Sequence, residues 1–95
     1  MLEVVARMGV NPTVKHDYIQ LVEELVAKTV LEDGCIGYHL CQESEKADEY
    51  AIVETWENQQ YLDAHMQSEH FQRLIPQITN LTNSGIQIAV YDVLK

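Results

Sequence analysis

The apolar residues of this chain change their spacing along its length, and the order of those changes limits the folds that are open to it. Residues Leu2 to Val10 are rich in β-branched valine and lead into the turn sequence Asn11-Pro12, which predicts a strand. From about Val14 to Leu31, apolar side chains recur at the spacing of an amphipathic helix, and Gly34 suits a cap at its end. The apolar stripe of this helix consists of Tyr18, Leu21, Val22, Leu25, Val26 and Val30.

Two further strands follow, Cys35 to Gln42 and Tyr50 to Trp56, and the polar segment 43–49 between them suits a hairpin loop. The two Cys residues, Cys35 and Cys41, would lie about 20 Å apart on one strand, so no disulfide within the chain is expected. We expect these strands to pair antiparallel.

Two short helices and a strand complete the chain. Asn58 and Ser68 can each cap a helix, and Pro76 is expected to bend or shorten the second one. A turn at Asn83-Ser84-Gly85 leads into the last strand, Ile86 to Leu94. The order strand, helix, strand, strand, helices, strand predicts an α+β, ferredoxin-like fold: a four-stranded antiparallel sheet with helices on one face.

Apolar residues occur on both faces of the segments Leu2 to Val10 and Ile86 to Leu94, which we expect at the edges of the sheet. Because the helices cover only one face, the other face of both segments needs a second layer. The sheet of another subunit is the simplest such layer. We therefore expect a homodimer in which two sheets face each other, a dimeric α+β barrel.

Length and charge restrict the function. The 95 residues suit one domain, 1–95, and the net charge of −9 opposes binding to nucleic acid or to anionic membranes. The first residues lack a basic stretch followed by an apolar core, and no apolar run is long enough to span a bilayer. We therefore expect a cytoplasmic protein with neither a nucleic acid nor a membrane as partner.

Histidines are the first candidates for chemistry. His65 and His70 are five positions apart, so on one continuous helix they would diverge by about 140° and could not grip one metal ion, although a break at Gln67-Ser68 could bring them together. With no carboxylate or Cys at a known ligand spacing, no metal is expected. His65 is either a base that takes a proton from an acidic hydroxyl or a packed structural residue; His70 has the same two readings.

Trp56 shares one face of its strand with Glu54. A buried Glu54 must be paired or protonated, and a hydrogen bond to a neighbouring strand is one way to pair it. Trp56 is either a core anchor or a flat wall for an aromatic ligand, with its indole N–H as a donor. The alternation along the second strand does not reveal whether Tyr38 faces the same pocket. No phosphate loop, flavin fingerprint or nicotinamide fingerprint occurs, so any oxidation must take its electrons from the substrate.

Three pieces of the chain carry a resemblance through their order and spacing: Glu32-Asp33-Gly34-Cys35-Ile36-Gly37-Tyr38, Ile52-Val53-Glu54-Thr55-Trp56-Glu57 and His65-Met66-Gln67-Ser68-Glu69-His70-Phe71. Together they resemble the antibiotic-biosynthesis monooxygenase family, and with the flanking elements the resemblance covers essentially the whole chain. It implies a small dimeric α+β barrel that oxidises a quinol or polyketide-like aromatic with dioxygen, without flavin, haem or metal.

On this basis His65 is the candidate base and Trp56 the second candidate catalytic residue, with Glu54, Tyr38, His70 and Phe71 as candidate substrate-binding residues. Haem-degrading relatives use an asparagine on the first strand, where this chain has Val5, Arg7 and Met8. Relatives that act on phosphorylated molecules need a cationic site, and basic residues are few here. A non-catalytic small-molecule binding module is the alternative, with haem binding as a third reading.

Overall fold

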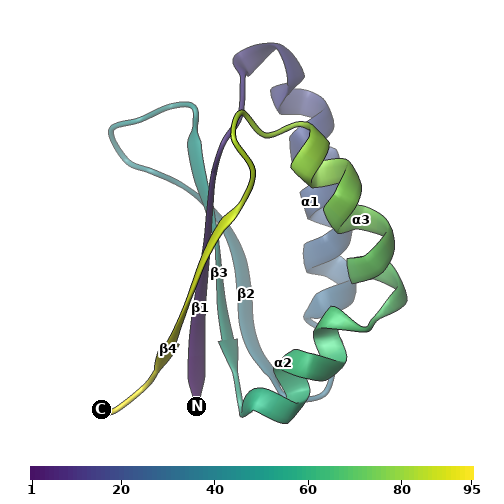
Figure 1. Ribbon diagram of the computed structural model, residues 1–95, viewed down its shortest axis with the longest axis vertical. Coiled ribbons are helices and arrows are strands. Elements are labelled where there is room, and N and C mark those ends of the chain that lie inside the picture. Colours follow the sequence, from purple (N-terminus) through teal and green to yellow (C-terminus); the bar gives the residue numbers. More distant parts are fainter.

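The computed structural model describes residues 1–95, and its elements follow the order expected from the sequence. The strands form one four-stranded sheet, and the helices lie against one of its faces (Figure 1). This arrangement confirms the ferredoxin-like α+β fold. The elements are β1 (Leu2–Gly9), the short 3-10 helix η1 (Pro12–Val14), α1 (Lys15–Thr29), β2 (Cys35–Gln42), β3 (Glu49–Trp56), α2 (Gln59–Met66), α3 (Glu69–Asn80) and β4 (Gln87–Asp92).

The strand order is β2-β3-β1-β4, and every neighbouring pair is antiparallel. β1 is therefore an inner strand with a partner on each side, and the expectation that it lies at an edge is wrong. β4 is shorter than the predicted strand. Its ladder ends at Asp92 because this residue pairs with Leu2, where β1 itself begins.

α1 packs one face on the sheet and buries Tyr18, Val22, Leu25 and Thr29. This face matches the predicted apolar stripe, but the helix ends two residues earlier than Leu31. Val30 is consequently 47% exposed. Gly34 does not cap the helix directly; it lies in the following turn, where its φ of +78° requires a residue without a Cβ.

The two predicted caps are confirmed. The Asn58 side chain accepts a hydrogen bond from the Tyr61 N–H at the start of α2, and Ser68 accepts one from the Phe71 N–H at the start of α3. The predicted shortening of α3 at Pro76 is wrong, since the helix continues to Asn80. Pro76 is exposed, while Leu74 and Ile78 on either side of it are fully buried and hold both halves of the helix on the core.

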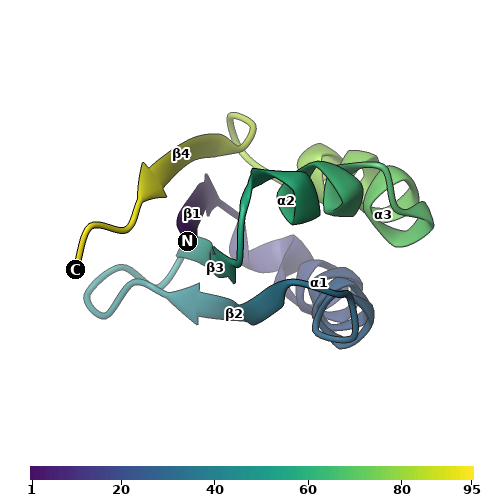
Figure 2. The same cartoon turned by 90° about the horizontal axis from the view of Figure 1, so that it is seen from below.

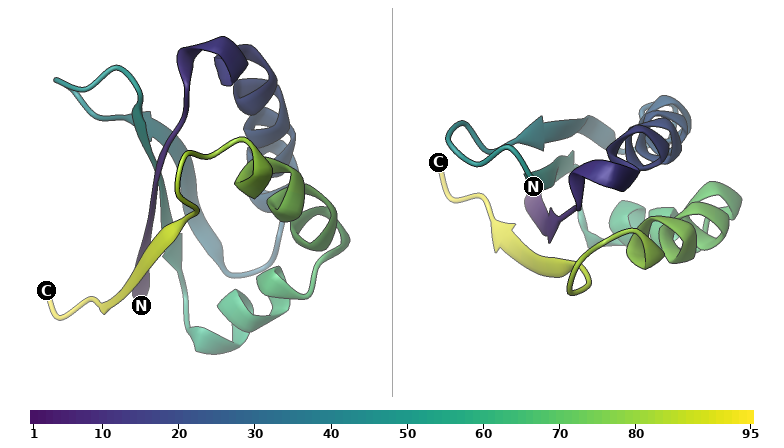
Figure 3. Two further views of the ribbon diagram at one scale, coloured as in Figure 1. Left: turned by 45° about the horizontal axis from the view of Figure 1, so that its top comes forward. Right: turned by 90° about the horizontal axis from the view of Figure 1, so that it is seen from above.

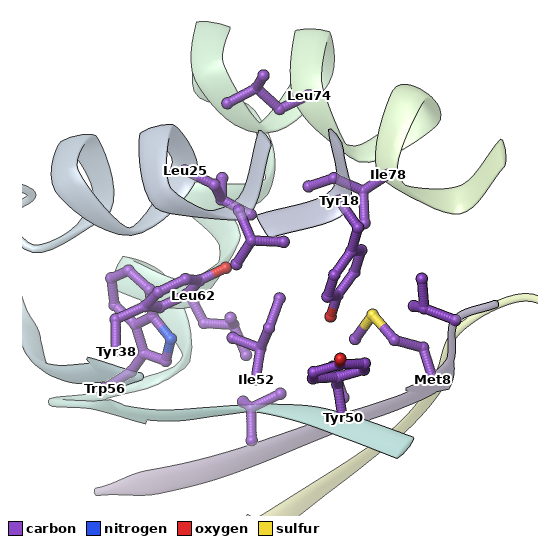
Figure 4. Close-up of a cluster of buried hydrophobic side chains, with 14 of the residues drawn as sticks. Met8, Tyr18, Leu25, Tyr38, Tyr50, Ile52, Trp56, Leu62, Leu74 and Ile78 are labelled. Atoms are coloured by element: carbon purple, nitrogen blue, oxygen red, sulfur yellow. The ribbon is translucent and has the colours of Figure 1, made fainter. Parts of the chain in front are cut away.

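The hydrophobic core lies between the sheet and the helices (Figure 4). In β1 the buried residues alternate strictly, with Leu2, Val4, Ala6 and Met8 facing inward. In β3 the inward face consists of Tyr50, Ile52, Glu54 and Trp56, all buried. The face shared by Glu54 and Trp56 is thus the helix-covered face of the sheet.

The other face of the sheet carries no helix, as the views from below and from above show (Figure 2 and the right-hand view of Figure 3). Half-buried Val5 and Val53 pair across β1 and β3 on this face, and Ala89 and Tyr91 of β4 extend it. Every residue of β4 is exposed, including Ile88 at 64% and Tyr91 at 53%. The expectation that both faces of the last strand are buried does not hold within a single chain.

Two further expectations concern disulfide bonds and membrane-spanning helices. Cys35 and Cys41 are both free thiols, as expected from their separation along β2. No helix combines the length and the apolar character that crossing a bilayer requires.

Candidate functional site

Glu32 lies in the turn after α1, and its carboxylate reaches His65 of α2. Gly34 lies so close to Tyr61 that a Cβ at this position would overlap the Tyr61 ring. The Gly34 carbonyl also accepts a hydrogen bond of 2.9 Å from the Glu57 N–H, just beyond β3. The turn is therefore held between a helix and the end of a strand, and Glu32 has a fixed position.

A break between α2 and α3 brings His65 and His70 together. α2 ends at Met66, and the Ser68 hydroxyl donates to the His65 carbonyl at 2.6 Å while it accepts from Phe71. The two imidazole centroids are 6.1 Å apart. The divergence of about 140° calculated for a continuous helix therefore does not apply, and the break anticipated at Gln67-Ser68 is present.

One oxygen of Glu32 serves both histidines. Its Oε2 atom lies 2.7 Å from Nδ1 of His65 and 2.7 Å from Nε2 of His70. Because a carboxylate only accepts hydrogen bonds, these two ring nitrogens carry the protons. The remaining nitrogen of His65, Nε2, is then a lone-pair acceptor, and it is buried without any hydrogen-bond partner.

Aromatic rings surround His65, which is only 1% exposed. The His65 ring centroid lies 4.8 Å from that of Trp56, 5.0 Å from Phe71 and 5.4 Å from Tyr38. Tyr38 is also the cross-strand neighbour of Glu54 and is buried, so it faces the helices. Tyr38 therefore lies on the same face of the sheet as Glu54 and Trp56, which the sequence could not reveal. The six candidate residues of the sequence analysis form one cluster.

Burial governs the ionisation of the groups in this cluster. It lowers the pKa of His65, against the opposing effect of the Glu32 carboxylate, so the neutral imidazole is favoured. It raises the pKa of Tyr38 far above its usual range, helped by the charge of Glu54. Around His65, therefore, both the imidazole and the phenol are held in their uncharged forms.

Glu54 is the buried carboxyl group that the strand pattern indicates, but its partner differs from the one expected. The Trp56 indole N–H donates to Glu54 Oε1 at 2.9 Å, along the same strand rather than from a neighbouring one. Burial raises the pKa of Glu54 to about 7; the Trp56 hydrogen bond lowers it and the charge of Glu32 raises it. The indole N–H is engaged in this bond, so it is not free to donate to a ligand.

Glu32 belongs to this cluster, although no pattern in the sequence marked it as a candidate. It lies 33 residues from His65 in the chain, so no local spacing links the two. The only signal was its place at the start of the segment Glu32-Asp33-Gly34-Cys35, where it contributed to a family resemblance but received no role of its own.

Surface hollows lie beside this cluster rather than in it. One of about 300 Å³ lies between α1 and β2 and reaches Tyr38 and His39. Another of about 430 Å³ lies on the uncovered face of the sheet near Val5 and Arg7. Neither is lined by Trp56, His65 or Phe71, and His65 packs directly against the other two rings.

Comparison with known proteins agrees with the fold. A conserved protein from Methanosarcina mazei Go1 is 30% identical to this chain, with a TM-score of 0.93. The match covers 95% of this chain and 89% of that protein. A crystal structure of an antibiotic biosynthesis monooxygenase is 29% identical with a TM-score of 0.92, over 100% of both chains.

A curated relative, the uncharacterized protein sll1783 of Synechocystis sp. (strain ATCC 27184 / PCC 6803 / Kazusa), is 24% identical over 97% of this chain. The present chain spans only 63% of the length of that relative. Residues 1–77 match the sequence model of the family described as antibiotic biosynthesis monooxygenase, and the chain belongs to that family.

Proposed function

We propose that this protein is a cofactor-independent monooxygenase that oxidises a small hydroxylated aromatic, of the quinol or polyketide type, with dioxygen. The observation that carries the proposal is the Nε2 atom of His65, a buried hydrogen-bond acceptor with no partner in the protein. A buried polar atom without a partner costs free energy, and a catalytic role is one of the explanations for such an atom in a folded protein. A phenolic hydroxyl group would satisfy it.

Glu32 suits His65 to the role of general base. The hydrogen bond from Nδ1 to the carboxylate fixes the tautomer and the ring orientation, so that the lone pair is on Nε2. When Nε2 takes a proton, the adjacent carboxylate stabilises the imidazolium that forms. The pair therefore has both the geometry and the charge for removing a phenolic proton.

The oxidation that follows balances without an external reductant. The phenolate gives one electron to O2, and the aryloxyl radical and superoxide combine to form a C–O bond at a ring carbon. The peroxide takes the proton back from His65; loss of the ring proton and cleavage of the O–O bond then leave a carbonyl and release water. One hydroquinone and one O2 give one hydroxyquinone and one water, and all the electrons that reduce O2 come from the substrate.

The other candidate residues supply the walls of the site. Trp56 and Tyr38 present buried aromatic surface to the imidazole and exclude water. Glu54 holds the indole in place through its hydrogen bond. His70 and Phe71, both half-buried in the first turn of α3, lie where the cluster meets solvent, and we assign substrate access to this turn.

We also propose that the protein acts as a homodimer. The helix-free face of the sheet and the exposed side chains of β4 present apolar surface that a second sheet would cover. Support comes from Val5 and Val53 at the centre of this face and from Tyr91 near its edge. The two sheets facing each other would form the dimeric α+β barrel.

One observation favours the non-catalytic alternative. His65 is packed directly against Trp56 and Phe71, as it would be in a binding module whose site opens only for its ligand. The haem reading gains no such support. Val5 and Arg7 lie on the uncovered face of the sheet, and Met8, which faces inward, lacks the amide group of the asparagine that haem-degrading relatives use.

Oxygen uptake decides between the enzyme and the binder. An oxygen electrode with a panel of quinols should show consumption above the uncatalysed rate, and the consumption should persist after treatment with a metal chelator. With labelled dioxygen, one labelled atom should enter each product molecule. Ligand-induced changes in Trp56 fluorescence without oxygen uptake for any quinol would instead favour the binding module.

A further inference from the structure

We propose that Glu32, His65 and His70 also form a binding site for a divalent transition-metal ion such as Zn²⁺, and that the bound ion switches off His65 as a base. The site itself stands on geometry alone. Only the inhibition rests on the proposed monooxygenase activity.

The donor set is chemically suitable. One carboxylate oxygen and two imidazole nitrogens can each offer one ligand atom, and these atoms lie within 4.8 Å of one another. Zinc binds such donors at about 2.0–2.2 Å, which places the donors of a tetrahedral site about 3.4 Å apart. Glu32 Oε2 lies 2.7 Å from each nitrogen, so a small outward shift of the carboxylate makes room for an ion.

The three side chains come from separate elements that are each held in place. Glu32 is on the turn anchored by Gly34, His65 is in the last turn of α2, and His70 is in the first turn of α3. Ser68 fixes the angle between the two helices through its bonds to the His65 carbonyl and the Phe71 N–H. The site is therefore largely formed before an ion arrives, which reduces the ordering cost of binding.

An ion can reach the site and is attracted to it. The side chains of Glu32 and His70 are 17% and 13% exposed, so the donors open to solvent on one side, while His65 lies beneath them. The chain carries a net charge of −9, which raises the local concentration of cations. With three protein donors, one position remains for water, as in many zinc sites.

Metal binding and base chemistry exclude each other at His65. An ion at Nδ1 requires the lone pair of that nitrogen, so in the neutral imidazole the proton moves to Nε2. Nε2 then carries the proton and is a hydrogen-bond donor, so it can no longer accept a phenolic proton. When Zn²⁺ is bound, His65 cannot act as a base, and the Glu32 carboxylate coordinates the ion.

Binding is tested with Co²⁺ as a spectroscopic probe, with no aromatic substrate present. The wild-type protein should bind one Co²⁺ per chain with visible absorption bands that Zn²⁺ abolishes by displacement. Glu32→Gln and His70→Gln should each weaken binding by more than the roughly 10- to 100-fold that follows loss of a group which merely orients a ligand. His16→Gln, which removes an exposed histidine from the start of α1, is the matched control and should bind as the wild type does.

Circular dichroism must show that each variant is folded before its affinity is compared. Unchanged Co²⁺ affinity in folded Glu32→Gln and His70→Gln would overturn the site, as would an equal loss in His16→Gln. Because this readout needs no turnover, it remains decisive even if oxygen uptake is never found.

Inhibition is tested by titrating Zn²⁺ and Fe²⁺ into the oxygen-uptake assay. Uptake should fall with Zn²⁺ along the same curve that Zn²⁺ follows in displacing Co²⁺. Two histidines and one carboxylate are also the donors of many non-haem iron oxygenases, so Fe²⁺ is the informative alternative ion. An increase in uptake with Fe²⁺, beyond the O2 that Fe²⁺ and quinol consume without protein, would overturn the inhibitory role and assign the metal to catalysis instead.

Discussion

Glu32 and His65 are joined by a hydrogen bond of 2.7 Å between Oε2 and Nδ1, although 33 residues separate them in the chain. The turn that holds Glu32 and the helix that holds His65 meet because Gly34 permits close contact with Tyr61. The bond determines which nitrogen of His65 carries the proton. It therefore determines whether the buried Nε2 atom can act as a base.

Replacing Glu32 by Gln should impair catalysis more than binding. A carboxamide keeps the size of the side chain but loses the charge that stabilises the imidazolium, so kcat should fall by roughly 100-fold or more while KM changes little. Steady-state oxygen uptake gives both constants. Glu45→Gln, an exposed glutamate in the loop between β2 and β3, serves as control and should match the wild type; an unchanged kcat in Glu32→Gln would remove Glu32 from the mechanism.

The buried carboxyl group of Glu54 should make stability depend on pH. Its pKa is about 7 in the folded protein against an ordinary 4.5, so the folded state holds the proton more tightly than the unfolded chain does. The stability from this proton is fully present below about pH 4.5 and is lost as the pH rises through 7. The difference in pKa corresponds to about 3 kcal/mol.

Glu54→Gln should flatten this dependence, because a carboxamide does not titrate and its oxygen can still accept from Trp56. Denaturant unfolding at several values between pH 4.5 and 8 measures the change in the free energy of unfolding. Glu49→Gln, at the exposed start of the same strand, should leave the dependence as it is in the wild type. A Glu54→Gln profile as steep as that of the wild type would show that Glu54 titrates normally.

Two glycines with positive φ should respond differently to alanine. Gly34 has a φ of +78° and an added Cβ would overlap Tyr61, whereas Gly85 has a φ of +85° and no atom within 4 Å of the added Cβ. Gly85→Ala should cost about 1 kcal/mol from backbone strain alone, and Gly34→Ala about 3 kcal/mol because overpacking is added. Equal losses in thermal or denaturant unfolding would mean that the contact with Tyr61 relaxes freely.

The sequence was sufficient to predict the order of elements, the caps at Asn58 and Ser68 and the fact that Glu54 and Trp56 share one strand face, because these follow from local periodicity and local hydrogen bonds. It could not reveal the partner of His65, which depends on how a turn and a helix meet in space. It also misplaced β1 at an edge, since strand order is a property of the whole sheet. The break at Gln67-Ser68 could be predicted only in part. The Ser68 cap was recognisable in the sequence, but the approach of His65 to His70 depends on the tertiary structure.

The helix-free face should mediate dimer formation. Tyr91→Glu puts a charge on exposed β4 and should shift the sedimentation equilibrium from dimer toward the 10.9 kDa monomer at micromolar concentration. Leu31→Glu introduces the same charge at a side chain that is 82% exposed in the turn after α1, and it should leave the dimer intact. A wild-type protein that sediments as a monomer would contradict the proposed barrel.

The central claim is that Nε2 of His65 takes the proton of a phenolic substrate, and chemical rescue tests it most directly. His65→Ala removes the base and leaves a space beside Trp56, so oxygen uptake with an accepted quinol should fall by roughly 100- to 10,000-fold. Added imidazole should restore part of the rate in His65→Ala and should not accelerate the wild type. Uptake that stays at the wild-type rate in a folded His65→Ala protein would contradict the account.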